Sequence, residues 1–273
     1  MASEIAAVNG RVALVTGAAR GIGAATVLAL AGDGWSVLAV DSAADDPALP
    51  YPMATRADLS AVVSRASGGA GGGRAHSFVA DVRDADAVTA AVAEAERRWG
   101  GLDAAIAAAG VIAGGVPLWE VPPAQEQAVL DVNLGGVLSL ARAAVPALLR
   151  RPAPRSGRFL AVASAAATRG LPMLAAYCAA KAGVTGLIRA LAAELADSGV
   201  TANAVSPGST ATAALDESAR LYGLPGAAAF AAQQPAGRLL DPAEVAAVLA
   251  FLAGPASSGM TGAVVPVDGG LAL

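Results

Sequence analysis

The two side chains in this sequence best suited to chemistry are Tyr177 and Lys181, four residues apart in Y-C-A-A-K. On a helix this spacing places both side chains on one face, one turn from each other. Lys181 is the only lysine among 18 lysine and arginine residues, and its compact ammonium carries three rotatable donors. A fixed positive charge favours the phenolate of a nearby tyrosine, whose pKa is otherwise about 10. The spacing therefore predicts that Tyr177 is an acid and base, with a chance pair on a solvated face as the alternative.

A glycine-rich loop, T-G-A-A-R-G-I-G, lies between a predicted strand at 12–16 and a helical pattern at 24–30. Gly17 would form the tight turn, Gly21 would let phosphates approach, and Gly23 would let the helix pack on the sheet. Backbone N–H groups at such a helix N-terminus bind a pyrophosphate. The loop thus predicts a dinucleotide site.

Asp41 ends the second predicted strand, 18 residues after Gly23. A carboxylate at this position accepts hydrogen bonds from the adenosine ribose hydroxyls, and its charge repels a 2′-phosphate. Arg20 in the glycine loop could instead meet a phosphate. We give Asp41 the greater weight and predict NAD over NADP, with an ordinary strand-end aspartate as the alternative.

The elements that must position these residues alternate along the chain between short apolar runs and helical patterns of ten or more residues. Such alternation predicts right-handed βαβ crossovers and a parallel sheet. We expect an α/β fold, a single Rossmann-type domain over residues 1–273, with a doubly wound sheet of about seven strands and helices on both faces. The predicted strands are Val12 to Thr16, Ser36 to Val40, Ser77 to Ala80, Ala104 to Ala108, Phe159 to Ala163, Thr201 to Val205 and Val264 to Val267.

Two segments interrupt this alternation. The first, about 42–73, is longer than a simple crossover requires and includes the tract G-G-A-G-G-G. The second, about 209–240, is rich in alanine and is predicted to cover the substrate, which would then be an apolar alcohol or ketone. Packing within a mobile lid is the alternative for its larger side chains, Leu215, Leu221, Tyr222 and Phe230.

Composition excludes several classes of function. Cys178 is the only cysteine and His76 the only histidine, so an internal disulfide and a His/Cys metal cluster are excluded. His76 is expected just before the third strand, on the surface, and Cys178 is expected to pack as a small apolar group. A net charge of −4 gives no electrostatic footprint for nucleic acid. We see no membrane span and no signal peptide, and we expect a cytoplasmic protein.

A set of residues spread over nearly the whole chain, from position 11 to position 270, carries a family resemblance. In chain order they are Gly17, Gly21, Gly23, Asp41, Asp81, Val82, Asn133, Ser164, Tyr177 and Lys181. The set also includes a P-G pair at 207–208 and a final V-D-G-G at 267–270. With this set, the sequence resembles the short-chain dehydrogenase/reductase family.

The resemblance implies a role for each polar member of this set. Tyr177 would be the acid/base, and Ser164 would orient the carbonyl or alcohol oxygen. Lys181 would bind the nicotinamide ribose and lower the tyrosine pKa, while Asn133 would hold a water that extends the proton relay. Cofactor contacts are implied for Gly17, Arg20, Gly21, Ile22, Gly23, Asp41, Asp81, Val82, Ala109, Gly110, Tyr177, Lys181, Pro207, Gly208, Thr210 and Thr212.

Within the cofactor set, the family places Asp81 on the adenine amino group and the Val82 backbone on the ring. The last four residues of the set lie where the family binds the nicotinamide carboxamide. One departure stands out, because the family usually has N-N-A-G after the fourth strand and this chain has alanine at 107–109 before Gly110. The missing asparagine hydrogen bonds put the rigidity of this loop in doubt.

The resemblance implies an NAD-dependent oxidoreductase that transfers a hydride between nicotinamide and a small, apolar secondary alcohol or ketone. The segment Y-P-M-A-T at 51–55 is similar to an insertion in the mycofactocin-associated, carveol dehydrogenase-like subgroup. That similarity implies tightly retained NAD and an external redox carrier, and a plain surface loop is the alternative. An NADPH-dependent 3-oxoacyl thioester reductase and a non-catalytic NAD-binding sensor remain the other functions. The family further implies a homotetramer or homodimer.

Overall fold

The central element of the fold is a seven-stranded sheet in which every neighbouring pair of strands is parallel. The computed structural model describes residues 10–68 and 72–273. The strand order is β3-β2-β1-β4-β5-β6-β7, which confirms the predicted doubly wound α/β fold. The strands are β1 (Val12–Thr16), β2 (Ser36–Asp41), β3 (Arg74–Val79), β4 (Ala104–Ala107), β5 (Arg158–Val162), β6 (Thr201–Pro207) and β7 (Val264–Val267).

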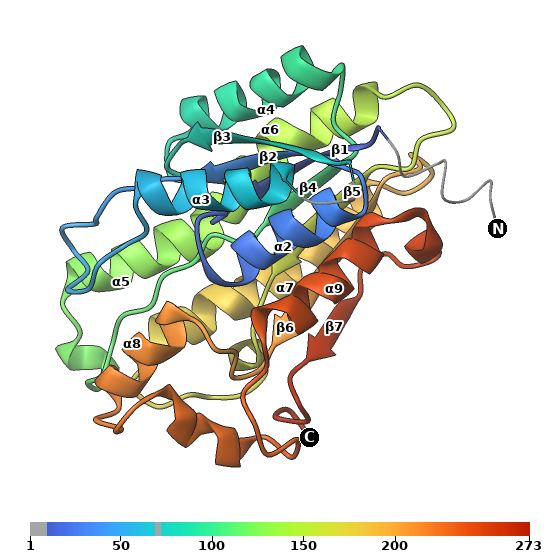
Figure 1. Cartoon of the computed structure of the whole chain (residues 1–273). Helices are drawn as coiled ribbons and strands as arrows, with labels where there is room; N and C mark the ends of the chain where they lie inside the picture. Colours follow the sequence, from blue (N-terminus) through green and yellow to red (C-terminus); the bar gives the residue numbers. More distant parts are fainter. Residues whose placement is uncertain (1–9, 69–71) are drawn as a thin grey trace.

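Helices cover both faces of the sheet (Figure 1). One face carries α2 (Gly21–Gly32), α3 (Arg56–Ser67) and α9 (Pro242–Ala253). The other carries α4 (Ala85–Trp99), α6 (Gly136–Arg150) and α7 (Ala175–Glu194). In β1, Val12 and Leu14 join one core cluster while Ala13 and Val15 join the other. Because both faces are buried, the central strands read as continuous apolar runs.

The order of the strands reverses between β1 and β4. Strands β2 and β3 follow on one side of β1, whereas β4 to β7 follow on the other side. Thr16 is in register with Val40 on one side and Ala107 on the other, so the carboxyl ends of three strands meet there. Open α/β sheets bind ligands in the crevice that forms at such a switch point. The glycine loop at 17–23 begins at this point.

Strand β3 departs from the sequence expectation. It begins at Arg74 rather than at Ser77, and His76 lies inside it, paired with Leu38. Because β3 is an edge strand with partly buried side chains, its polar residues did not resemble a buried strand. The other predicted strands are confirmed, with ends that move by at most two residues.

The long segment at 42–73 divides into a loop and a helix. Thr55 and Asp58 form a reciprocal capping box that starts α3. In the preceding loop, Leu49 packs with Ala113 and Val129 in a small separate core. Residues 69–71, in the middle of the glycine tract at 68–73, lie outside the described residues.

Among the described residues, one helical stretch is long and apolar enough to cross a membrane by length and composition alone. It covers 123–150 and joins α5 (Pro123–Leu130), a π-helical turn (Asp131–Gly135) and α6. Its inward side chains Leu140 and Leu148 are fully buried in the core against the sheet. Packing in a globular core accounts for its apolar character.

The second long segment contains α8 (Ala213–Leu221) and a 3₁₀ helix (Ala227–Gln233). Both lie beyond the carboxyl ends of the strands, apart from the two helical layers (Figure 1). We call residues 209–240 the lid. Short 3₁₀ helices also occur at Leu118–Glu120, Ala165–Ala167 and Pro255–Ser257.

Candidate active site

A continuous cavity of about 710 Å³ lies at the carboxyl ends of the strands. It extends from the loop after β2, across the glycine loop, to the lid. Every residue that the sequence singled out for catalysis or cofactor binding lines it. These are Gly17, Arg20, Gly21, Ile22, Gly23, Asp41, Asp81, Val82, Ala109, Gly110, Asn133, Ser164, Tyr177, Lys181, Pro207, Gly208, Thr210 and Thr212.

Ser164 and Tyr177 come from different elements that meet at the middle of the cavity. Ser164 follows β5 and caps a 3₁₀ turn, where its hydroxyl accepts a hydrogen bond from the Ala166 N–H at 3.1 Å. Tyr177 lies in the first turn of α7. Desolvation raises the pKa of Tyr177, and a hydrogen bond with Ser164 only partly offsets that rise. Its hydroxyl is therefore protonated at neutral pH.

Lys181 lies one turn further along α7 and is 4% exposed. Its Nζ donates to the Val162 carbonyl at 2.9 Å and lies 5.8 Å from the centroid of the Tyr177 ring. Burial lowers the pKa of Lys181 to about 8. That this ammonium lowers the pKa of Tyr177 stays a prediction, because burial of the phenol is the largest influence on that pKa in the protein alone.

The ammonium of Lys181 supplies a test of whether a nicotinamide nucleotide fits. An ammonium has three donors, and only one hydrogen bond of Lys181 is made within the described residues. The remaining donors belong to a side chain that lines the cavity. A buried charge with free donors beside the cavity suits the hydroxyls of a ribose, and the residues present fit the cofactor.

Asn133 is fully buried in the π-helical turn before α6. Its Oδ1 accepts from the Val111 N–H at 3.0 Å, and its Nδ2 donates to the Val111 carbonyl at 2.8 Å. The Thr16 hydroxyl holds the other end of the same loop by accepting from Ala108 N–H at 3.2 Å and Ala109 N–H at 3.3 Å. These bonds fix the loop that lacks the usual asparagines, and thereby answer the doubt about its rigidity.

The glycine loop is packed too closely to accept larger residues. Gly17 has a φ of +65°, and a Cβ there would lie 2.6 Å from the Ala109 backbone. A Cβ on Gly23 would overlap the Gly17 carbonyl oxygen. The glycines therefore keep the backbone open at the start of α2, where N–H groups can bind phosphate.

Asp41 and Arg20 both contact backbone near the glycine loop. The two carboxylate oxygens of Asp41 accept from the N–H groups of Ala19 and Ala43, each at 3.0 Å. Arg20 donates from Nη1 to the Pro52 carbonyl at 3.0 Å. Asp41 is thus held between the glycine loop and the start of the loop after β2, while Arg20 is bound by the loop at 42–55 that covers this end of the cavity.

The carboxylate of Asp81 is bound by Arg83, which was not among the predicted site residues. Arg83 donates to Asp81 from Nε and Nη2, at 3.0 and 2.6 Å, and to Asp46 from Nη1 at 2.6 Å. Burial raises the pKa of Asp81, but the hydrogen bonds and charge of Arg83 hold it below its ordinary value. Arg83 therefore ties the loop at 42–55 to the loop after β3.

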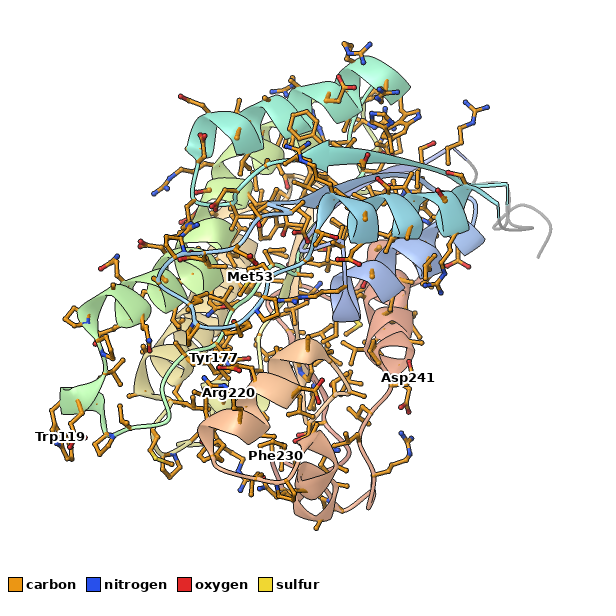
Figure 2. All side chains as sticks on the ribbon, turned by 60° about the vertical axis from the view of Figure 1, so that its left-hand side comes forward. Met53, Trp119, Tyr177, Arg220, Phe230 and Asp241 are labelled. Atoms are coloured by element: carbon orange, nitrogen blue, oxygen red, sulfur yellow. The ribbon has the colours of Figure 1, made fainter. Side chains whose placement is uncertain are left out.

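The lid closes the other end of the cavity with apolar side chains. Leu215, Tyr222 and Phe230 line the cavity as expected. The Tyr222 hydroxyl donates to the Pro172 carbonyl at 2.7 Å, and its ring meets Phe230 edge-on with centroids 6.1 Å apart. Leu221 was misassigned, because it faces a separate small cavity between the lid and the loop at 113–115. In the view of Figure 2, Tyr177 lies between Met53 of the 42–55 loop and Phe230 of the lid.

Two residues that drew attention in the sequence lie away from the chemistry. Cys178 is partly buried, and its Sγ faces the Arg169 and Leu171 carbonyls at 3.8 and 4.0 Å. On β3, the Nε2 atom of His76 lies 2.7 Å from Nη2 of Arg98 on α4. Desolvation and the nearby charge of Arg98 lower the pKa of His76. Neither residue lines the cavity.

The chain matches known proteins over almost its full length. A family model described as enoyl-(acyl carrier protein) reductase matches residues 17–272. The short-chain reductase protein NovJ of Streptomyces niveus is 40% identical over 271 residues, covering 98% of this chain and 96% of its own. The chain belongs to the short-chain dehydrogenase/reductase family. It is therefore an NAD(P)-dependent oxidoreductase of that family.

Two further proteins similar to this short-chain dehydrogenase/reductase are named for different substrates. The cis-4-hydroxycyclohexanecarboxylate dehydrogenase of Sinomonas cyclohexanicum is 40% identical over 264 residues, 95% of this chain and 96% of its own. The crystal structure of carveol dehydrogenase from Mycobacterium avium in complex with NAD has a TM-score of 0.90 at 32% identity. That comparison covers 96% of this chain and 98% of the other.

Sequence reasoning missed the residues of this short-chain dehydrogenase/reductase that act through tertiary contacts. Asp46, Met53 and Arg83 line the cavity on the side of Asp81, and Arg169 lines it on the side of Ser164. For Arg83, the D-V-R spacing after β3 was a usable signal, because a cation two residues from Asp81 can return to it. No local pattern marked Asp46 as its second partner.

Proposed function

We propose that this short-chain dehydrogenase/reductase transfers a hydride between NAD and a small, largely apolar secondary alcohol or ketone. The observation that carries the proposal is the buried Lys181, whose free donors lie beside the cavity and one turn from Tyr177. Ser164 lines the same part of the cavity. When bound there, the nicotinamide supplies the hydride acceptor or donor. The apolar side chains of the lid support an apolar substrate body.

Tyr177 would exchange a proton with the substrate oxygen. Because the pKa of Tyr177 lies above neutral pH, its hydroxyl carries the proton that the reductive direction requires. In the oxidative direction Tyr177 must first lose that proton, so oxidation should speed up toward alkaline pH. Ser164 would donate a hydrogen bond to the same oxygen, an interaction that can contribute about 3 kcal/mol to the transition state. Asn133 remains the predicted site of a relay water.

Charge at the adenosine end supports NAD over NADP. Four carboxylates and two guanidinium groups line this end of the cavity, and the latter are already bound by protein groups. A 2′-phosphate would add negative charge to an acidic environment. We expect NADH to support turnover far better than NADPH, as measured by initial rates with one ketone. The acidic residues are Asp41, Asp45, Asp46 and Asp81, and the cations are Arg20 and Arg83.

Tight retention of NAD is the finer part of this proposal. The loop at 42–55 is fixed over the adenosine end by three links, from Arg20 to Pro52, from Arg83 to Asp46, and from the Ile112 N–H to the Tyr51 hydroxyl at 3.0 Å. NAD cannot leave by this side unless such links open. They support membership of the mycofactocin-associated subgroup and reoxidation by an external carrier. Purified protein should hold NAD through extensive dialysis, and a fully active enzyme rebuilt from apoprotein by micromolar NAD would contradict retention.

Two other functions make different predictions. A 3-oxoacyl thioester reductase would prefer NADPH, which the acidic adenosine end disfavours. A sensor would bind a partner according to the redox state of NAD and would show no turnover. A panel of secondary alcohols with an artificial electron acceptor separates an enzyme from a sensor, and turnover of any member supports the proposed function.

We further propose a cytoplasmic homotetramer or homodimer. The half-exposed Phe251 on α9 and the strongly exposed Trp119, at the edge of the molecule in Figure 2, are apolar surface that a second copy could cover. Light scattering on a sizing column measures the assembly, and a monomer at micromolar concentration would contradict it.

A further inference from the structure

The substrate end of the cavity contains one charged side chain. We define this end as the lining residues within 164–177 and 213–233 together with Leu271. Within that set, all described residues other than Arg169 are apolar or neutral. A single cation in a largely apolar site raises the question of what balances its charge.

The backbone of Arg169 is fixed to both elements that carry the reacting groups. Its N–H donates to the Ala165 carbonyl at 3.0 Å, in the turn that Ser164 caps. Its carbonyl faces Cys178 on α7, the residue next to Tyr177, at 3.8 Å. The position of Arg169 is therefore set relative to the substrate oxygen.

The guanidinium of Arg169 is oriented by one hydrogen bond. Its Nη1 donates to the carbonyl of Leu271 at 2.6 Å, and Leu271 also lines the cavity. A guanidinium has five N–H donors, so most of them remain available. The contact holds the charged group at the edge of the substrate end.

No carboxylate neutralises this cation within the part of the chain that the structure describes. By contrast, Arg83 pairs with Asp46 and Asp81, and Arg220 on the lid pairs with Glu217 at 2.6 Å. The planar fork of a guanidinium matches a carboxylate in a bidentate pair. Arg169 thus has the charge, the donors and the location to bind an anionic part of a substrate.

We propose that the substrate of this enzyme is a hydroxy acid or oxo acid, with a carboxylate remote from the carbinol carbon, and that Arg169 binds this carboxylate. The apolar lid would then contact the carbon skeleton between the two polar ends. This inference rests on the proposed function, because it names the substrate class of the same site.

The test compares acids with matched neutral amides. Initial rates are measured for 4-hydroxypentanoate, 5-hydroxyhexanoate and 6-hydroxyheptanoate and for their primary amides, with the NAD-loaded enzyme and an artificial electron acceptor. For the best chain length, kcat/KM should favour the acid by roughly two- to fivefold, since Arg169 is exposed and an ion pair open to solvent contributes modestly. The preference should decrease as ionic strength rises, because the site is open to solvent at Arg169.

Variants assign the preference to Arg169. In Arg169→Gln the ratio of acid to amide should fall close to one, mainly through KM for the acid. Arg169→Lys should keep part of the preference because the charge remains. The control is Arg65→Gln, which removes one positive charge from an exposed position on α3 outside the cavity and should keep the parent ratio.

The outcomes separate this inference from the proposed function. Turnover of amides as efficient as that of acids, or a full acid preference in Arg169→Gln, overturns the inference and leaves the oxidoreductase function standing. An absence of turnover with every acid and amide overturns the proposed function, and the inference is overturned with it.

Discussion

Replacing Lys181 with methionine should make the protein more stable and inactive. In the folded protein, burial lowers the pKa of Lys181 to about 8, whereas an unfolded lysine titrates near 10.4. At pH 7 the native state therefore holds a desolvated charge, at a cost on the order of 3 kcal/mol for a shift of this size. Methionine removes that cost but leaves the Val162 carbonyl without its donor, which costs about 1 to 2 kcal/mol.

The pH dependence of this difference has a definite sign. Below pH 8 Lys181 is charged in both states, so its full burial cost is present. Between the folded and unfolded pKa values the unfolded chain binds more protons, so the stability of the parent rises with pH. Lys181→Met should therefore be more stable than the parent by about 1 to 2 kcal/mol at pH 7, and this advantage should disappear by pH 10.

Denaturant unfolding of NAD-free protein at pH 7, 8.5 and 10 measures the effect. Removing NAD matters because a bound ligand would stabilise the parent selectively. Arg189→Met is the matched control, because Arg189 is exposed on the same helix and should show no pH-dependent difference. A Lys181→Met protein that is less stable at pH 7, or a difference that does not change with pH, would refute the reasoning.

Further substitutions test three contacts at the cofactor site and in the lid. Arg83→Gln and Asp46→Asn should each speed the release of NADH by roughly 5- to 30-fold, the equivalent of 1 to 2 kcal/mol. Stopped-flow fluorescence measures this rate, and the double variant should release NADH little faster than either single variant. Additive effects would mean that the two residues act separately. Thr16→Val should weaken NAD binding with little loss of fold, because it frees two loop N–H groups; calorimetry with an unchanged Kd would contradict this. Tyr222→Phe should raise KM by a few fold through loss of its bond to Pro172, and unaltered kinetics would show that this bond does not hold the lid.

The fold was predictable because its signals are local. Buried parallel strands read as apolar runs, and the three glycines mark the first turn because they lie between a strand pattern and a helical pattern. Strand β3 was displaced because an edge strand tolerates Arg74 and His76. Leu221 was assigned to the wrong cavity because the sequence does not show which way a helical side chain turns within the lid.

The arrangement of the site was less predictable, since it depends on long-range contacts. The positions of Tyr177 and Lys181 follow from helical spacing, but the raised pKa of the tyrosine depends on burial by segments far away in the chain. The link between Asp46 and Arg83 joins two loops 37 residues apart. Arg169 carried no motif, and only the cavity shows that it faces the substrate end.

The central claim is that Tyr177 transfers the proton that accompanies hydride transfer at this site. The most direct measurement is a single-turnover reduction of a ketone by the NADH-loaded enzyme, followed by the loss of NADH absorbance, for the parent and for Tyr177→Phe. General acid catalysis contributes about 10² to 10⁴ in rate, so the variant should retain NADH and react at least about a hundredfold more slowly. A variant that binds NADH and reacts at a tenth of the parent rate or faster would contradict the account.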